Sequence, residues 1–579
     1  MESIRIIIVG GSRKFFDQKM LSRLLVQPRL ASFISRAVAF PHAEIILTER
    51  VNADLLVPHI IGFLKRQGIS QGDIRIRHPT ESIEAKIPGA LAGGLRESGL
   101  DFGADVAERD DGLSRYFVST HSYQAIRDHR RHIVVGPKGS GKSAILKELT
   151  AENSTTLVIT PEHYATELLD AIIKNPVSTE LAAFITTWKY TLLIEIFRTA
   201  VQHQVGTAES LKRIRQYLIV HGHSAGELSL FERFLMYLRR ISQVKGKIGP
   251  AETEIGLEPN RVEELGKLFK MDELLVLVPD LQKVLRRTTL TVYVDELDQS
   301  WNNSEMANRF LISLLTAAIQ LRGIAENLHV VVFLRSEIFD LIKPYLPQLD
   351  KLRSDIETLH WSRRELRDLI AKRALDSLSL SDSKVDLEQV IKTIFPVALE
   401  GTGLDGLDFA ITRTSRRPRE LIQICNLALY AAAELDYRLI QADAILRAEE
   451  EFSKWKAEHI VAEYMYIYPG LKALVERFRG KPRRMSYSAL DAEIGSIILQ
   501  FQEDSQAPAW ISTAIEPLEI IQILYEIELI GIEKIGAPAG DGRQPWESYD
   551  YVFSRPSGKP ELSQTFLFHP GVWKALEMV

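Results

Sequence analysis

One stretch of the chain, residues 131–149, constrains its fold more than any other. It reads RHIVVGPKGSGKSAILKEL, in which three β-favouring residues end at a glycine-rich loop and a helix-forming run follows. The loop has the spacing G-x-x-x-x-G-K-S, which is typical of a phosphate-binding loop between a strand and a helix. The pattern therefore predicts an α/β fold in which this loop follows a strand of a parallel sheet.

The residue types of the loop suit the binding of a nucleotide. Glycines let backbone N–H groups curl around phosphate oxygens, and the helix N-terminus adds the positive end of its dipole. Lys142 is placed to reach the β- and γ-phosphates, and the Ser143 hydroxyl is placed to ligate Mg²⁺. The residues expected to contact the nucleotide here are Gly136, Pro137, Lys138, Gly139, Ser140, Gly141, Lys142, Ser143 and Ala144.

A second stretch, residues 289–301, supplies two adjacent carboxylates. It reads TLTVYVDELDQSW, so a β-branched run delivers Asp295 and Glu296 at its carboxyl end. Ligands of open α/β sheets bind at that edge, so we expect this strand beside the phosphate loop. Asp295 would hold Mg²⁺, and Glu296 would orient and deprotonate the attacking water. Asp298 is a third candidate, with a solvated loop carboxylate as the alternative.

Composition indicates an ordinary globular protein of the cytoplasm. The 579 residues suffice for three or four domains, and 45% are hydrophobic and 25% charged. A net charge of −5 gives no global basic field, so nucleic-acid binding would need a local patch. The single cysteine, Cys425, excludes an internal disulfide. The start of the chain lacks a secretory signal, and apolar runs such as 330–334 are too short to span a bilayer, so no membrane partner is expected.

The order of patterns along the chain predicts four parts. Alternating strands and helices open the chain, the phosphate-loop core follows with a mostly helical insertion, and a helical lid precedes helices and short strands of winged-helix type. The expected bounds are 1–97 for the α/β module, 98–361 for the core, about 165–287 for the insertion, 362–450 for the lid and 451–579 for the C-terminal domain.

The first part is the least informative of the four. We expect strands at 6–9, 44–48 and 73–77 and helices at 21–38 and 55–67, which favour a parallel or mixed sheet. Gly10 and Gly11 follow the first strand, where a small ligand or a tight turn would each suit them. No role for this module follows from its sequence.

Several arginines are candidates for contacting the γ-phosphate. Arg335 follows the predicted strand 329–334, where it would report the γ-phosphate or belong to a surface turn. Arg353 or Arg363 would enter the site of a neighbouring subunit as an arginine finger, with solvated helix charge as the alternative. Arg419, close to the start of a lid helix, is our first choice for contact from above, and Arg417 the second.

With these pieces in order, the chain resembles the AAA+/STAND-type P-loop ATPases. It more specifically resembles bacterial P-loop ATPases encoded among phage-defence and mobile-element genes. The matching segments are FGADVAERDDGLSRYFVST, GPKGSGKS, VYVDELD, FLRSEIFD, LHWSRRELRDLI and RRPREL, spread over roughly 100–450. The residues to which the resemblance gives the binding and hydrolysis of ATP with Mg²⁺ are Lys142, Ser143, Asp295 and Glu296. It also gives Arg335 or Ser336 the sensor-1 place, where AAA+ members usually have Asn or Thr, and Arg419 the sensor-2 place.

The C-terminal domain offers little for DNA. Its predicted third helix, 517–531, lies in EPLEIIQILYEIELIG, with four glutamates and no lysine or arginine, so insertion into a groove would be repulsive. The basic turn 477–484 is the nucleic-acid candidate, with a solvated loop as the alternative. DNA is therefore an alternative partner and not the favoured one.

These observations favour a regulatory switch that binds and hydrolyses ATP with Mg²⁺. It would control assembly or a partner effector, and a role in antiviral defence follows from the resemblance alone. We expect a homo-oligomer or a partner protein, because an arginine finger acts between subunits. The alternatives are a DNA-engaging ATPase resembling origin-recognition proteins and a nucleotide-gated scaffold with little hydrolysis. Glu296 argues against the scaffold, because its position suits the activation of water.

Overall fold

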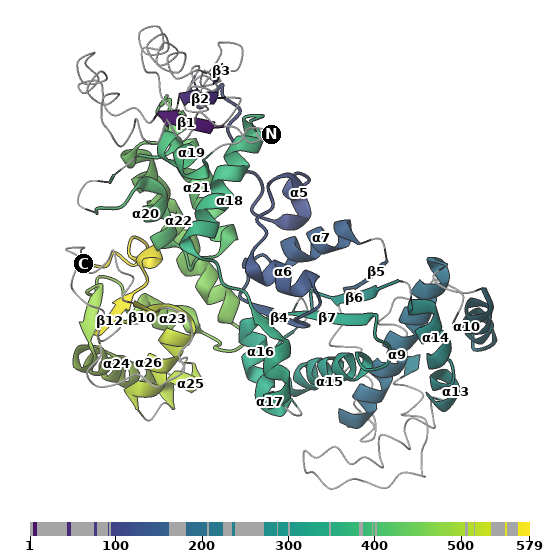
Figure 1. Ribbon diagram of the computed structural model, residues 1–579. Coiled ribbons are helices and arrows are strands. Elements are labelled where there is room, and N and C mark those ends of the chain that lie inside the picture. The colour runs from purple at the N-terminus through teal and green to yellow at the C-terminus, as the bar shows by residue number, and fades with distance from the viewer. Residues whose placement is uncertain are drawn as a thin grey trace, which may run out of the picture.

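The structure is a computed structural model of the chain, and it describes residues 4–8, 43–47, 74–77, 91, 94–153, 155–160, 181–204, 208–223, 234, 236, 237, 271–286, 288–298, 301–346, 349–380, 386–396, 398–399, 402–503, 508–513, 516–533, 551–552 and 565–579. Its centre is a sheet with helices on both faces, beside which a group of lid helices and a C-terminal part are stacked (Figure 1).

A five-stranded parallel sheet confirms the predicted α/β class. Its strands are β4 (Ile133–Gly136), β5 (Thr156–Ile159), β6 (Leu290–Val294), β7 (Leu328–Arg335) and β8 (Ile356–Thr358), in the spatial order β5-β6-β7-β4-β8. The order reverses around β4, and such a reversal opens a crevice at the carboxyl ends of the strands. The phosphate loop begins at this point.

The strands are buried on both faces, which explains their continuous apolar sequence. Along β4 the side chains alternate: Ile133 and Val135 belong to one core cluster, and Val134 belongs to another. The second cluster includes residues of α6 (His121–Arg127) and α7 (Lys142–Glu152) on one face of the sheet. The first includes residues of α9 (Leu181–Gln202) and α15 (Glu305–Leu321) on the other face (Figure 1).

The described residues of the predicted insertion are helical, as expected. After α9 come α10 (Ala208–Val220), α13 (Met271–Leu275) and α14 (Val278–Leu285), which pack onto the same core cluster. The hairpin that VKGKIGPAETEIGLE suggests at 244–258 lies outside the described residues. The bounds of the four parts of the chain stay predictions.

The lid consists of helices around a core cluster of their own. They are α18 (Arg363–Ser377), α19 (Leu387–Ile394), α20 (Gly406–Arg413), α21 (Pro418–Glu434) and α22 (Ala442–Tyr464). A capping box starts α18, because the Ser362 hydroxyl accepts from the Glu365 N–H and the Glu365 carboxylate accepts from the Ser362 N–H. The helix α22 continues past the lid, since Phe452 lies in the lid cluster and Ile460 lies in the next one.

The C-terminal part combines helices with an antiparallel sheet. The helices are α23 (Leu471–Glu476), α24 (Tyr487–Gln502), α25 (Ala509–Ser512) and α26 (Pro517–Glu526), and the strands are β9 (Arg484–Ser486), β10 (Ile530–Glu533), β11 (Tyr551–Val552) and β12 (Thr565–Phe568), in the order β11-β10-β12-β9. The predicted helix 517–531 is too long at its end, because the chain turns at Glu528, with φ of 60°, and pairs with β12 from Ile530 onward. Membership of the winged-helix class stays a prediction.

The described strands of the first part form a parallel sheet. They are β1 (Ile4–Ile8), β2 (Ala43–Leu47) and β3 (Ile74–Arg77), paired in that order and close to the expected bounds. The two predicted helices and the glycine pair at 10–11 lie outside the described residues.

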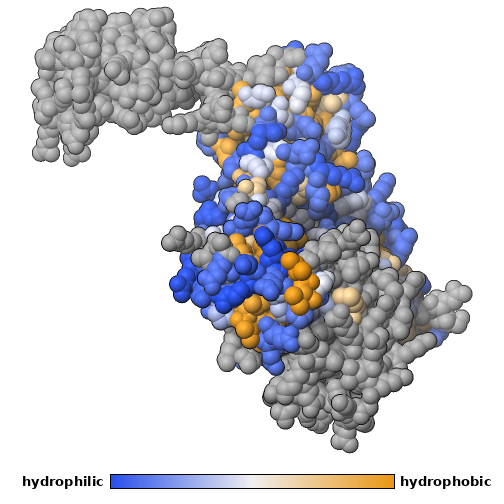
Figure 2. Space-filling model, turned by 90° about the vertical axis from the view of Figure 1, so that its right-hand side faces the viewer, coloured by the Kyte–Doolittle hydropathy of each residue, from blue (hydrophilic) through white to orange (hydrophobic). Residues whose placement is uncertain are grey.

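On the face shown in Figure 2, the residues coloured by hydropathy are largely hydrophilic, with smaller groups of hydrophobic residues between them. A search of the described residues found no helix with the length and apolar character that a membrane span requires.

Candidate nucleotide-binding site

A cavity of about 280 Å³ lies at the carboxyl end of the central sheet, between the core and the lid. The phosphate loop, the ends of β6 and β7, the lid and the segment 104–120 all contribute to its lining. The lining residues most relevant to phosphate chemistry are Lys138, Gly139, Gly141, Lys142, Ser143, Ala144, Asp295, Glu296, Asp298, Arg335, Trp361 and Arg419. The structure thus brings residues from distant parts of the chain, such as Lys138 and Arg419, around one space.

The glycines of the loop adopt backbone conformations that other residues rarely adopt. Gly139 and Gly141 have φ of 80° and 97°, in the left-handed region that favours glycine. A Cβ atom at Gly139 would also lie only 3.0 Å from the Cβ atom of Arg419. Because Gly141 precedes α7 and brings no side-chain cap, the first N–H groups of this helix suit the oxygens of a phosphate.

Three residues of the predicted loop contacts lie outside the lining of the cavity. Gly136 and Pro137 direct their carbonyl groups at the Lys142 ammonium, which donates to them at 2.7 and 2.9 Å. Ser140 is 3% exposed, and its carbonyl accepts from Trp361. These residues lie around the base of the loop, and their direct contact with a nucleotide stays a prediction.

Burial and neighbouring charges act in opposite directions on Lys142. Burial lowers the pKa of its ammonium to about 8, while Glu337, Asp295 and Asp298 raise it. The carbonyl groups of Gly136 and Pro137 hold the ammonium at the base of the loop. A charged amine held by exchangeable carbonyl contacts is well suited to bind phosphate oxygens.

The acid pair lines the same cavity as the loop, although the two do not follow neighbouring strands. The strand β6 is not adjacent to β4, because β7 lies between them. Asp295 is 5% exposed, and burial raises its pKa to about 6. Glu296 has φ of 60°, and such conformations in residues other than glycine cluster at functional sites.

The donor set of the cavity fits Mg²⁺ held together with a phosphate. Ser143 and Asp295 both line the space, and Mg²⁺ in nucleotide sites takes one or two protein oxygens and completes its octahedron with phosphates and water. The described residues contain no cluster of three or more side chains able to hold a metal without such a partner.

Arg335 is held at the edge of the cavity by carboxylates. It forms a close ion pair with Asp298 and lies 3.8 Å from Glu337. Asp298 is thus a mostly buried partner of Arg335 and not a solvated loop carboxylate. Glu337, the second residue of α16 (Ser336–Ile342) after β7, is 3% exposed, and burial raises its pKa.

The two arginines at the start of α21 face opposite sides. Arg419 lines the cavity, packs on Gly139 and donates from its backbone N–H to the Gly139 carbonyl at 3.3 Å. Arg417 is 3% exposed and points behind the loop, toward Glu463 and Glu528. Arg419, our first choice for contact with the γ-phosphate, thus lies at the cavity, and Arg417, the second choice, does not.

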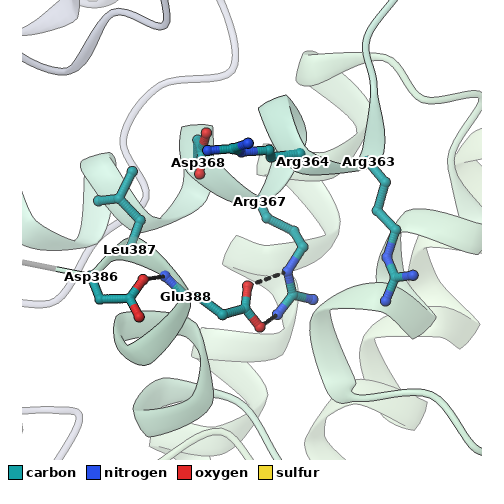
Figure 3. A pocket seen from close by; sticks show the side chains of 7 residues that line it. All are labelled: Arg363, Arg364, Arg367, Asp368, Asp386, Leu387 and Glu388. Atoms are coloured by element: carbon teal, nitrogen blue, oxygen red, sulfur yellow. Dashed lines mark hydrogen bonds and ion pairs between the residues drawn. The ribbon is translucent and has the colours of Figure 1, made fainter.

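The other two arginine candidates lie outside the cavity. The Arg353 side chain is 80% exposed, and its recorded ion pair is with Asp350 at 3.8 Å. Arg363 forms a close ion pair with Asp408 of the lid. It borders a separate hollow of about 670 Å³ between α18 and the start of α19, where Arg367 and Glu388 are paired at 2.7 Å (Figure 3). Arg363 is thus already paired with a carboxylate of the lid, whereas Arg353 is largely exposed.

The sequence did not predict a role at the site for two more residues, because only the fold brings them there. Trp361 lines the cavity and donates from its indole N–H to the Ser140 carbonyl at 2.9 Å. Arg373 lines the lid side and binds Asp110 at 2.8 Å and the Phe102 carbonyl at 2.7 Å. Arg373 thereby fixes the segment before the phosphate loop to the lid.

The parallel sheet, the loop after β4 and the carboxylates after β6 define a P-loop NTPase core. Comparisons with known proteins add a family match in the lid and a distant relative. The model of the FunZ-associated C-terminal helical domain matches residues 364–461, which run from α18 to most of α22. A transposon gamma-delta 80.3 kDa protein of Escherichia coli K12 is 23% identical over 497 residues, which cover 82% of this chain and 67% of that protein.

Solved structures with some similarity include two archaeal proteins. The Aeropyrum pernix ORC1 protein in complex with DNA is 10% identical, with a TM-score of 0.28, and the match covers 79% of this chain and 91% of that one. The Aeropyrum pernix ORC2 protein is 12% identical, with a TM-score of 0.32 and the same coverage. Scores this low identify no activity.

Proposed function

We propose that the chain is a Mg²⁺-dependent ATPase that works as a regulatory switch. The observation that carries the proposal is that Lys142, Ser143, Asp295 and Glu296 line one cavity, although they come from two stretches about 150 residues apart. This arrangement provides the positioning and the charge that phosphoryl transfer requires.

Each residue has a role that follows from its place in the cavity. The Lys142 ammonium leaves the Gly136 and Pro137 carbonyls and binds the β- and γ-phosphate oxygens. Ser143 and Asp295 hold Mg²⁺, which neutralises charge on the phosphates when bound. Glu296 orients a water molecule and accepts its proton.

Two arginines complete the phosphate side of the cavity. Arg335 exchanges part of its pairing with Asp298 for the γ-phosphate, and Arg419 approaches from the lid. Because Arg419 belongs to the lid and contacts Gly139 of the loop, loss of the γ-phosphate would release the lid. We infer that this motion is the signal that controls assembly or a partner effector.

The setting of this switch is the least constrained part of the proposal. The name of the Escherichia coli relative, a transposon protein, supports a role among mobile-element genes. A role in antiviral defence is proposed on that resemblance, and its trigger would be a partner protein.

The described residues do not favour a role in binding DNA. The helix α26 carries no lysine or arginine, and two of the five cations of the basic turn 477–484 are paired with carboxylates. Arg479 pairs with Glu476 and Glu577, and Lys481 pairs with Glu493. Paired cations release fewer counterions from DNA, so their contribution to affinity is small.

Phosphate release from ATP by the purified chain tests the proposal. We expect Lys142→Ala to weaken nucleotide binding, and Glu296→Gln to bind nucleotide but lose turnover by about 100-fold or more. Lys574→Ala and Glu305→Gln, both exposed and far from the cavity, serve as controls and should match the wild type. Turnover that survives Glu296→Gln would leave a nucleotide-gated scaffold, and stimulation by duplex DNA would revive the DNA-engaging alternative.

A further inference from the structure

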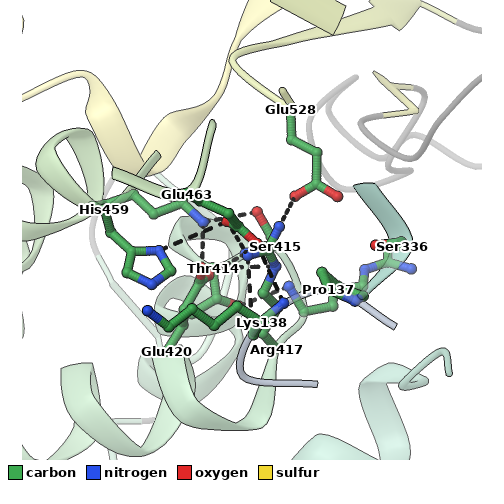
Figure 4. Close-up of polar contacts among 12 residues, drawn as sticks. Pro137, Lys138, Ser336, Thr414, Ser415, Arg417, Glu420, His459, Glu463 and Glu528 are labelled. Atoms are coloured by element: carbon green, nitrogen blue, oxygen red, sulfur yellow. Dashed lines mark hydrogen bonds and ion pairs between the residues drawn. The ribbon is translucent and has the colours of Figure 1, made fainter. Parts of the chain in front are cut away.

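A cluster of buried charges contacts Lys138 of the phosphate loop, and its members are not in the lining of the cavity (Figure 4). It consists of Arg417, Glu420, Lys456, Glu463 and Glu528, which we call the charge cluster. Arg417, Glu420 and Lys456 are 3%, 1% and 1% exposed. Charges in such surroundings persist only when they are paired, so each contact in the cluster has a strong geometric requirement.

The charge cluster holds one residue of the phosphate loop from two sides. The backbone N–H of Lys138 donates to the Glu463 carboxylate at 3.2 Å, and the Lys138 carbonyl accepts from the Arg417 guanidinium at 3.3 Å. Arg417 and Glu463 are in turn bonded to each other at 2.7 Å. Both polar groups of the Lys138 backbone are therefore fixed by a single buried ion pair.

The same guanidinium reaches the C-terminal part of the chain. Arg417 donates to the Glu528 carboxylate at 2.9 Å, across 111 residues of sequence. Glu528 lies between α26 and β10 with φ of 60°, and its backbone N–H donates to the Tyr525 carbonyl at 3.0 Å. Strained conformations of this kind persist where the surroundings or a function over-determine them.

The remaining members of the charge cluster fix the segment that carries Arg417. Lys456 of α22 donates to Glu420 at 2.5 Å and to the Ser415 hydroxyl at 2.8 Å. Glu420 also accepts from the Ser415 backbone N–H at 2.6 Å. The chain just before α21 is thus held in place, so Arg417 has one orientation between Lys138 and Glu528.

We propose that Arg417 and Glu463 are positioning residues that clamp the phosphate loop, and that Glu528 makes the C-terminal part a component of this clamp. The proposal rests on the proposed function, since the clamp acts on the nucleotide site. A nucleotide that orders the loop then strengthens the Arg417–Glu528 contact, and a partner that pulls on the C-terminal part loosens the loop. By thermodynamic linkage, such a partner lowers the affinity for the nucleotide by the same factor by which the nucleotide lowers the affinity for the partner.

The test compares two neighbouring glutamates in the full-length chain. Glu528→Gln removes the charge that reaches Arg417, whereas Glu526→Gln alters a residue of α26 whose carboxylate accepts from the Tyr468 hydroxyl at 2.9 Å within the C-terminal part. With a fluorescent ATP analogue and Mg²⁺ as the probe, we expect Glu528→Gln to raise the Kd about 5-fold or more, in the range of ordinary coupling energies. Glu526→Gln should leave the Kd unchanged, and equal Kd values for both variants and the wild type would overturn the clamp.

Hydrogen exchange separates this proposal from the proposed function. In the nucleotide-free chain we expect the Lys138 amide to exchange faster in Glu528→Gln than in Glu526→Gln. That result needs no nucleotide, so it tests the clamp even if the wild type fails to bind the analogue, and equal rates would overturn it. Where nucleotide binds, it should slow exchange around Glu528 in the wild type and lose this effect in Glu528→Gln.

A second variant keeps the proposal testable if Glu528→Gln folds poorly. Glu528→Gly also removes the carboxylate, but glycine favours the left-handed backbone at this position. We expect it to raise the Kd and to speed exchange of the Lys138 amide as Glu528→Gln does. A folded Glu528→Gly chain with wild-type values for both would count decisively against the clamp.

Discussion

The indole N–H of Trp361 donates a hydrogen bond to the Ser140 carbonyl at 2.9 Å. Trp361 precedes the first lid helix, and Ser140 lies in the phosphate loop, so this bond joins the lid to the loop at the edge of the cavity. The ring also packs on Gly141, where an added Cβ atom would lie 3.7 Å from it. A loop that rearranges around phosphate therefore changes the surroundings of this indole.

Trp361→Phe should remove the nucleotide-dependent part of the tryptophan fluorescence. The chain has seven tryptophans, and Trp361 is the one in the lining of the cavity among those that the structure describes. The loss of one hydrogen bond should lower the free energy of unfolding by about 1 kcal/mol. Trp510→Phe is the matched control, because its indole also donates to a carbonyl, that of Pro469, at 2.8 Å. A fluorescence response that persists in Trp361→Phe would show that the loop does not move against this ring.

Arg353→Ala tests the arginine finger that the sequence suggests. The side chain is 80% exposed, so its loss should leave the free energy of unfolding unchanged within about 0.5 kcal/mol. If Arg353 acts in a neighbouring subunit, turnover per chain should rise with protein concentration in the wild type and stay low in the variant. Size-exclusion profiles with and without ATP provide the companion measurement, and a monomer in both conditions would exclude the finger.

Arg373→Ala should destabilise the chain far more than Arg115→Ala. Arg373 and Asp110 form a buried ion pair, with side chains 5% and 3% exposed, so removing the arginine leaves a buried charge and should cost about 3 kcal/mol. Arg115 pairs with Asp376 at 2.9 Å but is 65% exposed, and exposed pairs contribute little. Chemical denaturation of the two variants measures the difference, and equal midpoints would contradict the expectation.

A group of histidines at the amino ends of β4 and β7 should make the stability of the folded chain sensitive to acid. His129 stacks on His329 with ring centroids 3.7 Å apart, and His132 lies beside them. Burial, together with the neighbouring histidines and the Arg322 charge, lowers the pKa of His132 and of His329 to about 4, although Asp355 opposes the shift at His132. A histidine whose pKa is lower in the folded chain stabilises it fully above pH about 6.5, and this stabilisation is lost as the pH falls toward about 4.

Denaturation at pH 7.5 and at pH 5.5 measures this effect. We expect each of His132 and His329 to contribute about 1 kcal/mol to the difference between the two conditions, after allowance for partial exposure. His329→Gln should reduce the loss on acidification, whereas the exposed His203→Gln should not. An unchanged pH dependence in His329→Gln would contradict the assignment.

The parts of the site that could be predicted are those written in contiguous sequence. The strand, loop and helix around Lys142 and the strand before Asp295 are encoded by neighbouring residues, so pattern and spacing suffice. The pairing of Arg335 with Asp298 depends on which strand lies between β4 and β6, and that is a property of the sheet order.

The charge cluster could not be predicted from patterns of neighbouring residues. Lys138 and Glu463 are 325 residues apart, and each is an ordinary charged residue in its own segment. The predicted end of α26 was wrong for a local reason. The composition of EIELIG suits a helix, but Glu528 turns the chain into β10. Tertiary packing overrides such preferences, and a single sequence does not record which distant partners will meet.

The long helix α22 has a mechanical consequence. Its 23 residues form one continuous helix. One end of the helix packs in the hydrophobic cluster of the lid and the other end packs in that of the C-terminal part. A rod of this length spans about 35 Å, so a tilt of about 5° at one end moves the other by about 3 Å. Lid opening by a small angle would thus be delivered to the C-terminal surface as a displacement large enough to expose or hide a docking patch, with α22 serving as the lever arm.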